Sequence, residues 1–309
     1  MVDSPPPDKR KHGYPPSAPT DVRVIARDPG APAPPAPATP LWHYTTFDAY
    51  ESISRTGVLW ASQIQYLNDE QEFRHARAVI ETELFDRLRA SGQAIMGEDL
   101  QSLRSVYDQA KGISKCVICF SESRDQLSQW RGYGLGVLSI AIGFDRQKLE
   151  DIASGLEHGW KLERCLYSRE HKAKAVAPIV TAISASWPAA NVEGAARRDA
   201  IRGAAFLKWD EYLHIAPRLK HDGFKEEAEL RLISMPYRTD GTWGFRRTAT
   251  LIVPYQEFPL FTPGEQTSVI QEILVGPSPH RVALVGALSQ LGLARGIRAP
   301  VRASDIPYR

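Results

Sequence analysis

The pattern of apolar and polar residues predicts a first strand and helix beginning at Leu41. The apolar segment LWHY predicts the strand, and Phe47, Tyr50 and Ile53 follow at helical spacing as far as Gly57. Threonines before this helix, acidic residues in its first turn and a glycine after its last turn are typical helix boundaries. The next segment, VLWAS, predicts a second strand.

A long amphipathic helix is expected after this second strand. Apolar residues recur there every three or four positions, as an amphipathic helix requires; they are Phe73, Ala76, Ile80, Leu84 and Leu88. Asn68 and Asp69, with Glu72 following Asp69 by three residues, have the arrangement of a capped helix start. This helix is therefore expected to begin close to Asp69.

Six later segments predict strands because they are short, apolar and partly β-branched. In chain order they are KCVICFS (115–121), GVLSIAIGF (136–144), LERCLY (162–167), ELRLISM, TATLIVPY and IQEILVG. Two further helices are predicted, one between these strands and one after the last of them. The first carries Ile201, Phe206, Trp209 and Leu213 and ends near Pro217; the second starts at Ser278-Pro279, carries Leu284, Leu288 and Leu291 and stops at Gly292.

This mixture of strands and segregated helices predicts one α+β domain over residues 41–309. We expect a mixed or antiparallel sheet, open to a split into two parts, with helices flanking it. Residues 1–40 differ, because they hold 12 of the 23 prolines and show no apolar periodicity. They predict an extended or disordered Pro-rich tail, either an inert spacer or an attachment point for a partner protein.

Charge and composition narrow the function classes. With 38 Lys and Arg against 36 Asp and Glu, the net charge is +2, too small for a protein that binds duplex DNA through phosphate neutralisation alone, although a local basic groove stays open. No apolar run approaches the roughly 20 residues that cross a bilayer, and residues 1–30 lack the apolar core of a signal peptide. We therefore expect a cytoplasmic protein without a membrane partner. Its three cysteines are too few for a disulfide framework.

The common catalytic and nucleotide-binding motifs are missing from the sequence. It contains no phosphate-binding loop, no G-x-G-x-x-G after a strand, no H-E-x-x-H and no G-x-S-x-G. Cys116 and Cys119 have the spacing of a metal or redox pair, but residues three apart on a strand point to opposite faces. Both cysteines are therefore expected in the core, and no metal site is predicted from them.

Four segments place polar groups where the pattern would otherwise predict apolar ones. They are WHYT (42–45), YLND (66–69), FSES followed by DQLSQWRGYGLG (120–136), and the stretch from Lys220-His221 to FKEEAELR (220–231). In the last of these, Glu227, Glu229 and Arg231 are expected to share one strand face. Helix caps, a charged edge strand or aromatic core packing would each explain one such segment by itself.

Taken in chain order, these segments resemble the bacterial family of the domain of unknown function 2971. The resemblance rests on HYT, YLND, CFSES with QWRGYG and SIAIGFD, FKEEAELRLI, ILVGPSPHR and SDIPYR, and it covers roughly residues 41–309. The Pro-rich tail lies outside it. The family name implies no activity.

A looser resemblance links the chain to ADP-ribosyltransferases of the His-Tyr-Glu type. Those enzymes carry a His followed by a small hydroxyl residue on an early strand, an aromatic residue after a later strand and short helix, and a Glu on a strand nearer the C-terminus. Here those positions fall to His43 with Thr45, to Trp130 or Tyr133, and to Glu229, which with Glu227 forms E-x-E. The chain departs from the pattern where Tyr rather than Gly follows the His, and where a Trp stands in WRGYG.

The resemblance implies an ADP-ribosyltransferase-like fold, with NAD as the substrate and a role for each matching residue. Glu229, or Glu227 in its place, would stabilise the oxocarbenium-like centre formed when the N-glycosidic bond of NAD breaks. The remaining roles would fall to His43 and Thr45 at a ribose hydroxyl, Trp130, Tyr133 or Tyr44 at the nicotinamide ring, Ser121 and Ser123 as braces for the glutamate, and Arg131 or Arg231 at the pyrophosphate. The acceptor stays open between a protein, a nucleic acid, a small molecule and water. By analogy alone, such an enzyme would be a defence or toxin-like effector.

Two other functions stay open. A non-catalytic sensing or interaction module would use the same residues as a ligand pocket without turnover. A metal-dependent hydrolase acting on nucleic acid would use Glu227, Glu229 and Asp69 as ligands or as an acid and base. The transferase hypothesis requires His43, an aromatic residue of WRGY and Glu229 to line one cleft.

Overall fold

The computed structural model describes residues 39–67, 72–112, 115–133, 138–156, 159–235, 243–248, 250–263 and 267–307. The chain divides into two units, Met1–Pro37 and Ala38–Arg309, and the described residues belong to the second. The predicted Pro-rich tail lies almost wholly outside the described residues. The predicted helix start at Asn68-Asp69 lies outside them as well.

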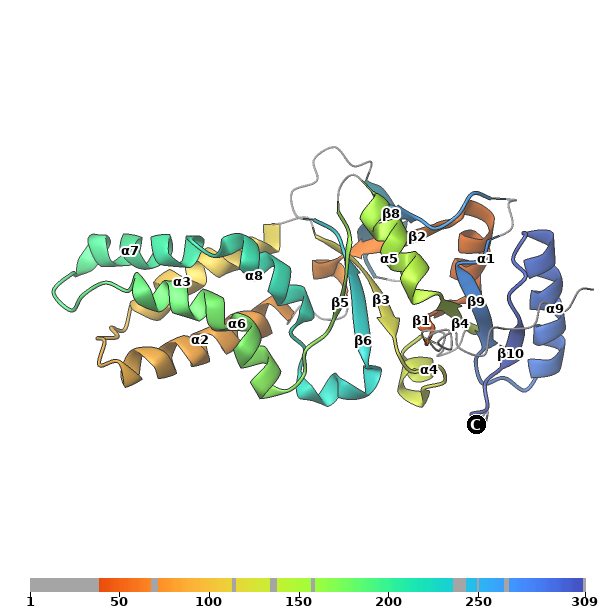
Figure 1. The fold of residues 1–309 in the computed structure, drawn as a ribbon, viewed down its shortest axis with the longest axis horizontal. Coiled ribbons are helices and arrows are strands. Elements are labelled where there is room, and N and C mark those ends of the chain that lie inside the picture. Colours follow the sequence, from red (N-terminus) through yellow and green to blue (C-terminus); the bar gives the residue numbers. More distant parts are fainter. Residues whose placement is uncertain are drawn as a thin grey trace, which may run out of the picture. The chain divides into compact units, whose positions relative to one another are not determined.

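The described residues form one ten-stranded sheet (Figure 1). In chain order its strands are β1 (Leu41–Thr46), β2 (Val58–Gln63), β3 (Cys116–Ser121), β4 (Ser139–Phe144), β5 (Lys161–Arg164), β6 (Glu229–Ile233), β7 (Gly244–Arg247), β8 (Ile252–Pro259), β9 (Ile270–Val275) and β10 (Val301–Ala303). Their pairings are antiparallel except for β9 with β10, which is parallel. The prediction of an α+β fold on a mixed sheet is confirmed.

The sheet forks at β3. One edge of β3 pairs with β6 through five residue pairs, the last of which places Ser121 opposite Glu229. Two strands share the other edge of β3. Strand β2 pairs with the first residues of β3, and β1 pairs with the last residue of β3, where Trp42 is opposite Ser121. From there the order continues through β4, β9 and β10 on the β1 side, and through β8 and β7 on the β2 side. Among the described strands, residues 118–120 therefore have no partner on this edge, and we call this place the fork.

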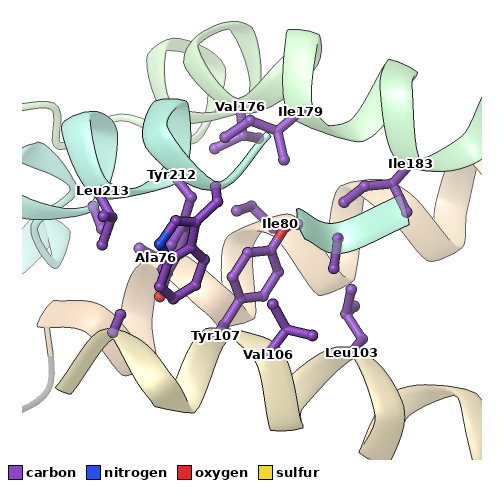
Figure 2. Close-up of a cluster of buried hydrophobic side chains, with 14 of the residues drawn as sticks. Ala76, Ile80, Leu103, Val106, Tyr107, Val176, Ile179, Ile183, Tyr212 and Leu213 are labelled. Carbon is purple, nitrogen blue, oxygen red and sulfur yellow. The ribbon is translucent and has the colours of Figure 1, made fainter. Parts of the chain in front are cut away.

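Nine α-helices are present in the described part of the chain. They are α1 (Phe47–Thr56), α2 (Glu72–Ala90), α3 (Asp99–Tyr107), α4 (Leu127–Tyr133), α5 (Arg146–Gly155), α6 (Arg169–Ala185), α7 (Gly194–Phe206), α8 (Trp209–Ile215) and α9 (Arg281–Ala294). Helices α2, α3, α6, α7 and α8 share one apolar core, and Figure 2 shows its side chains converging from several of them. Val117 and Ile233 of the sheet join this core. We call the sheet face that carries these two residues the bundle face.

The opposite face of the sheet has a core of its own. Ile118 of β3 and Leu232 of β6 pack there with residues of α1, α5 and α9. Cys116 belongs to this second core, whereas Cys119 packs against the bundle core. The two cysteines therefore point to opposite faces, as the strand period predicts.

The helix ends show which local signals were sufficient. Helix α1 begins after Thr46, whose side chain accepts a hydrogen bond from an N–H of the first turn, and ends at Gly57 in the left-handed conformation, as predicted. The single helix predicted up to Pro217 is wrong, because the chain breaks between Phe206 and Trp209 into α7 and α8. Helix α9 also differs from its prediction, since it begins at Arg281 and continues through Gly292. A Cβ at that glycine would lie 3.0 Å from a backbone carbonyl oxygen, so the glycine allows a close approach within the fold.

Candidate functional site

The bundle face changes from apolar to charged along β3 and β6. Alternate residues along a strand point to the same side of the sheet, so Glu229 and Arg231 lie on the face that carries Ile233. Glu229 is 5% exposed and Arg231 is 2% exposed. Charged side chains this deeply buried need partners, because an unpaired buried charge costs several kcal/mol.

The partners form an ion network that we call the Glu229 cluster, made of Lys220, Glu227, Glu229 and Arg231. Nζ of Lys220 donates to Oε2 of Glu229 and to Oε2 of Glu227, at 2.6 Å each. Nε of Arg231 donates to Oε1 of Glu229 at 2.7 Å, and its Nη1 donates to the carbonyl oxygen of Pro217 at 2.7 Å. Two carboxylates therefore converge on one ammonium group, and a guanidinium group holds the deeper carboxylate from the other side.

A left-handed residue creates this convergence. Ala228 has φ 43° and ψ 48°, and among the described residues it is the only non-glycine with positive φ. It separates Glu227, at the end of the 3₁₀ helix η4 (Asp222–Glu227), from Glu229, at the start of β6. The Oγ of Ser121 donates to the carbonyl oxygen of Glu227 at 2.6 Å and helps to hold the turn. Such a backbone conformation costs of order 1–3 kcal/mol in a non-glycine residue, and here it also ends η4, where the Ala228 N–H donates to the carbonyl oxygen of Lys225.

The expectation that three charged residues share a strand face needs correction for Glu227. Glu229 and Arg231 do share the bundle face of β6. Glu227 precedes the strand and reaches Lys220 only because the chain turns at Ala228. Alternation along a strand could not have predicted this turn, since it applies only inside the strand.

The charges in the cluster decide its ionisation state. Burial alone would raise the pKa of Glu229, but the positive charges of Arg231 and Lys220 outweigh it and lower this pKa to about 2. Burial likewise opposes the charge of Lys220, but the Glu229 carboxylate raises the pKa of the ammonium above its ordinary value. Glu229 is thus a carboxylate at neutral pH, as an electrostatic stabiliser of a cation must be.

Tyr133, the last residue of α4, stands next to the cluster. The residue as a whole is 46% exposed, whereas its hydroxyl end is buried. Burial, the Cys119 thiol and the Glu229 carboxylate together raise the pKa of its hydroxyl, so the phenol end lies near the cluster. Arg131, two residues earlier, is exposed. Of the predicted aromatic residues, Tyr133 combines access to solvent with proximity to Glu229.

Trp130 and Tyr44 are already packed against each other. They form a small apolar cluster with Trp42, with ring centroids 4.7 Å apart and planes at 73°. The Trp130 indole donates to Oδ1 of Asp125 at 2.6 Å, and the Tyr44 hydroxyl donates to the carbonyl oxygen of Ser123 at 2.8 Å. A nicotinamide ring would have to displace these contacts to stack on either residue.

His43 lies at the fork and is not brought together with Glu229. Strand alternation places His43 and Thr45 on the face opposite to Tyr44, and the imidazole packs against Phe120 with ring centroids 5.9 Å apart. Nδ1 of His43 donates to the carbonyl oxygen of Cys119 at 2.9 Å, because a carbonyl can only accept. Burial lowers the pKa of His43, which keeps the ring neutral at pH 7. His43 therefore satisfies a β3 carbonyl at the point where β1 diverges from β3.

Sequence reasoning did not assign a role to two polar partners of Glu229. Lys220 lay inside one of the polar segments, but its distance of nine residues from Glu229 gave no local signal for a contact. Tyr167 was placed at the end of a predicted strand, and its hydroxyl accepts a hydrogen bond from the backbone N–H of Glu229 at 3.0 Å. Two glutamates separated by one residue, with a lysine earlier in the same polar segment, are the available hint of an ion network.

The described residues contain no group of three or more His, Cys, Asp and Glu side chains arranged to hold a metal ion. Glu227 and Glu229 share an ammonium group instead, and Asp69 of the hydrolase alternative lies outside the described residues. A surface hollow of about 400 Å³, lined by residues such as Lys148 and Phe261, contains none of the predicted site residues. Among the described helices, none has the length and apolar character needed to span a membrane.

Comparison with known protein families gives a match over part of the chain. Residues 129–232 match the family model described as "Protein of unknown function (DUF2971)". The match runs from α4 to β6 and includes Arg131, Tyr133, Glu227, Glu229 and Arg231. It supports the resemblance to this family, whose description gives no activity. No curated protein and no solved structure matches the chain.

Proposed function

We propose that the chain cleaves the N-glycosidic bond of NAD at the Glu229 cluster, as an ADP-ribosyltransferase or an NAD glycohydrolase. The observation that carries the proposal is the convergence of two carboxylates on Lys220, with the hydroxyl of the partly exposed Tyr133 in electrostatic range of both. In the reaction, the bond between ribose C1′ and the pyridinium nitrogen breaks, and its electron pair leaves with nicotinamide. Water or an acceptor group then adds to C1′ and loses a proton.

The two glutamates differ in access, and this difference divides their roles. The Glu227 side chain is 28% exposed and the Glu229 side chain is 6% exposed. We therefore place Glu227 at the ribose hydroxyl and Glu229 behind it as a permanently ionised charge. Lys220 and Arg231 balance the two negative charges of the cluster, so the stabilisation must be local. A carboxylate oxygen of Glu227 in contact with the ribose would stabilise the positive charge that develops at C1′, most strongly in a water-poor setting.

The aromatic and histidine roles also change in this proposal. Tyr133 is the residue that can stack the nicotinamide ring, because Trp130 and Tyr44 are occupied by each other. His43 has no role at the reacting centre, because it packs against Phe120 on the other face of the sheet and binds a β3 carbonyl. The cleft of His43, an aromatic residue and Glu229 that the His-Tyr-Glu resemblance requires is therefore not formed, and the proposal rests on Glu227, Glu229 and Tyr133. The defence or toxin-like role implied by analogy would follow from depletion of NAD or modification of a target.

Release of nicotinamide from NAD by the purified full chain tests the proposal. Glu227→Gln and Glu229→Gln should each lower the release rate about 10²-fold or more, the scale found when one preorganised electrostatic group is removed. Glu226→Gln is the matched control, because Glu226 is exposed and lies in the same 3₁₀ helix. Wild-type release that is unchanged in both cluster variants would contradict the proposal.

A non-catalytic ligand-sensing module is the second candidate function. It is favoured by the pairing of Glu229 with both Lys220 and Arg231, and by the separation of His43 from this cluster. Calorimetric titration with NAD separates the two functions. Binding of NAD by a folded chain that releases no nicotinamide would identify the sensing module.

A further inference from the structure

Arg246 differs from Arg124 and Arg218, two other partly buried arginines. Arg124 forms two hydrogen bonds with the Glu272 carboxylate, and Arg218 forms an ion pair with Glu163. Arg246 is also half-buried, but its hydrogen bond goes to a neutral group, since Nη2 donates to the Oγ of Ser62 at 3.0 Å. Within the part of the chain that the structure describes, no carboxylate forms an ion pair with it. The remaining donors of this guanidinium group can therefore bind an anion.

A flat aromatic surface lies beside this arginine. Trp60 and Tyr255 stack with ring centroids 4.4 Å apart and planes at 21°, and Trp60 is 41% exposed. The Tyr255 ring lies over the backbone of Gly244, where a Cβ would come within 2.2 Å of the ring. A side chain at that position would push the Tyr255 ring aside, so Gly244 allows the ring to lie across β7. The aromatic pair is held in place before any ligand arrives.

Strand register puts these groups on one face. Ser62 is opposite Tyr255 in β8, and Arg246 is opposite Val253, two residues from Tyr255 on the same strand. Ser62 is also opposite Val117, which marks the bundle face. The guanidinium, the hydroxyl and the aromatic pair therefore share the bundle face with the Glu229 cluster.

Tyr133 connects the two groups of residues electrostatically. Its hydroxyl interacts with the charges of both Glu229 and Arg246. The phenol thus stands within electrostatic range of the carboxylates on one side and of the arginine on the other. The geometric link is the sheet itself, since β3 pairs with β6 on one edge and with β2 on the other.

We propose that Arg246 and Ser62 bind a phosphate group of a nucleotide whose base stacks on Trp60. A guanidinium group suits phosphate oxygens through parallel hydrogen bonds, and an exposed indole offers a face to any base. The inference rests on the proposed function in one respect, since the ADP part of NAD is the nucleotide expected there. It assigns the phosphate role to Arg246 in place of Arg231, whose Nε and Nη1 already bind Glu229 and Pro217.

Calorimetric titration of the full chain with ADP, adenosine and inorganic pyrophosphate tests this site. ADP should bind more tightly than adenosine, which lacks the phosphates, and more tightly than pyrophosphate, which lacks the base. Arg246→Gln should raise the Kd for ADP about tenfold or more. Arg247→Gln is the matched control, because the next residue along β7 is exposed and points to the other face. Trp60→Leu should weaken ADP binding without changing pyrophosphate binding.

Several results would overturn the nucleotide site. They are the absence of ADP binding, an equal loss of ADP affinity in Arg246→Gln and Arg247→Gln, or pyrophosphate binding as tight as ADP binding. A circular dichroism spectrum and thermal midpoint establish that each variant is folded. Arg246→Lys keeps the charge but loses the planar guanidinium group, so its Kd for ADP should lie between those of wild type and Arg246→Gln.

The inference and the proposed function fail in different ways. ADP binding that depends on Arg246, without any nicotinamide release from NAD, would keep the nucleotide site and remove the proposed reaction. Nicotinamide release that depends on Glu229 but is unchanged in Arg246→Gln would keep the reaction and remove this site.

Discussion

Two buried ion networks of this protein are built differently, and the difference separates structural charge from candidate functional charge. In the helical bundle, Arg197 and Asp99 are both fully buried and form two hydrogen bonds of 2.7 Å. Backbone carbonyls, including that of Ala94, accept from the same guanidinium. This pair joins α3 to α7 and leaves no side open to solvent.

The Glu229 cluster has the features that the bundle pair lacks. Glu227 is partly exposed, Ala228 is strained and Tyr133 stands near the carboxylates with nearly half of the residue accessible. A closed one-to-one pair has no hydrogen-bonding group left for a ligand. Where two carboxylates share one ammonium group, one of them can instead accept a hydrogen bond from a ribose hydroxyl. Burial by itself therefore does not mark a candidate site, whereas burial together with an open edge and a left-handed non-glycine residue does.

The largest effect on stability is expected from opening the bundle pair. Asp99→Leu leaves the Arg197 charge buried without its carboxylate and should lower the free energy of unfolding by about 3–5 kcal/mol. Arg198→Met provides the control, because its ion pair with Glu98 is about 40% exposed and should contribute less than about 1 kcal/mol. Urea denaturation measures both values. A loss below about 1 kcal/mol in Asp99→Leu would remove the distinction between the two networks.

A smaller effect should come from acid, and it should arise in the Glu229 cluster. The folded pKa of Glu229 is lowered to about 2, below the unfolded value near 4.3. A depressed folded pKa contributes stability above the unfolded pKa, and that stability is lost as the pH falls towards 2. The contribution at neutral pH is on the order of 3 kcal/mol.

Urea denaturation at pH 7, 5 and 3 checks this pH dependence. The difference in unfolding free energy between wild type and Glu229→Gln should be constant from pH 7 to 5 and should shrink at pH 3. Glu257→Gln, at an exposed position of β8, should follow the wild-type pH profile. A constant difference down to pH 3 would show that the carboxylate is not held ionised by Lys220 and Arg231.

Local sequence pattern was sufficient for most strands and insufficient for the fork. The run KCVICFS predicts β3 because β-branched and apolar residues are a property of the segment itself. The fork arises because β1 and β2, which are separated by α1, pair with different ends of the same β3 edge. Pairing partners and register depend on contacts between distant parts of the chain, so no single segment encodes them.

The same limit applies to the candidate site. The E-x-E pattern indicates Glu227 and Glu229 as candidates, and both carboxylates contact Lys220, although Glu227 lies outside the predicted strand face. Their cationic partner could not be predicted, because the path from η3 (Ala216–Arg218) to η4 decides where Lys220 points. His43 shows the reverse case, since its polar character suggested a ligand contact and its observed partner is a backbone carbonyl left open by the fork.

The smallest effect, and the sharpest for the comparison, is expected at Ala228. Glycine adopts the left-handed conformation without the steric cost of a Cβ, so Ala228→Gly should raise the free energy of unfolding by up to about 1 kcal/mol. A freer backbone also fixes the two glutamates less firmly on Lys220, so nicotinamide release should fall while stability rises. Ala228→Val, with a β-branched side chain that resists positive φ, should instead lower both the free energy of unfolding and the rate of nicotinamide release. Denaturation and release rates, measured together on the three proteins, would contradict a functional role of the strain if Ala228→Gly gained stability at an unchanged release rate.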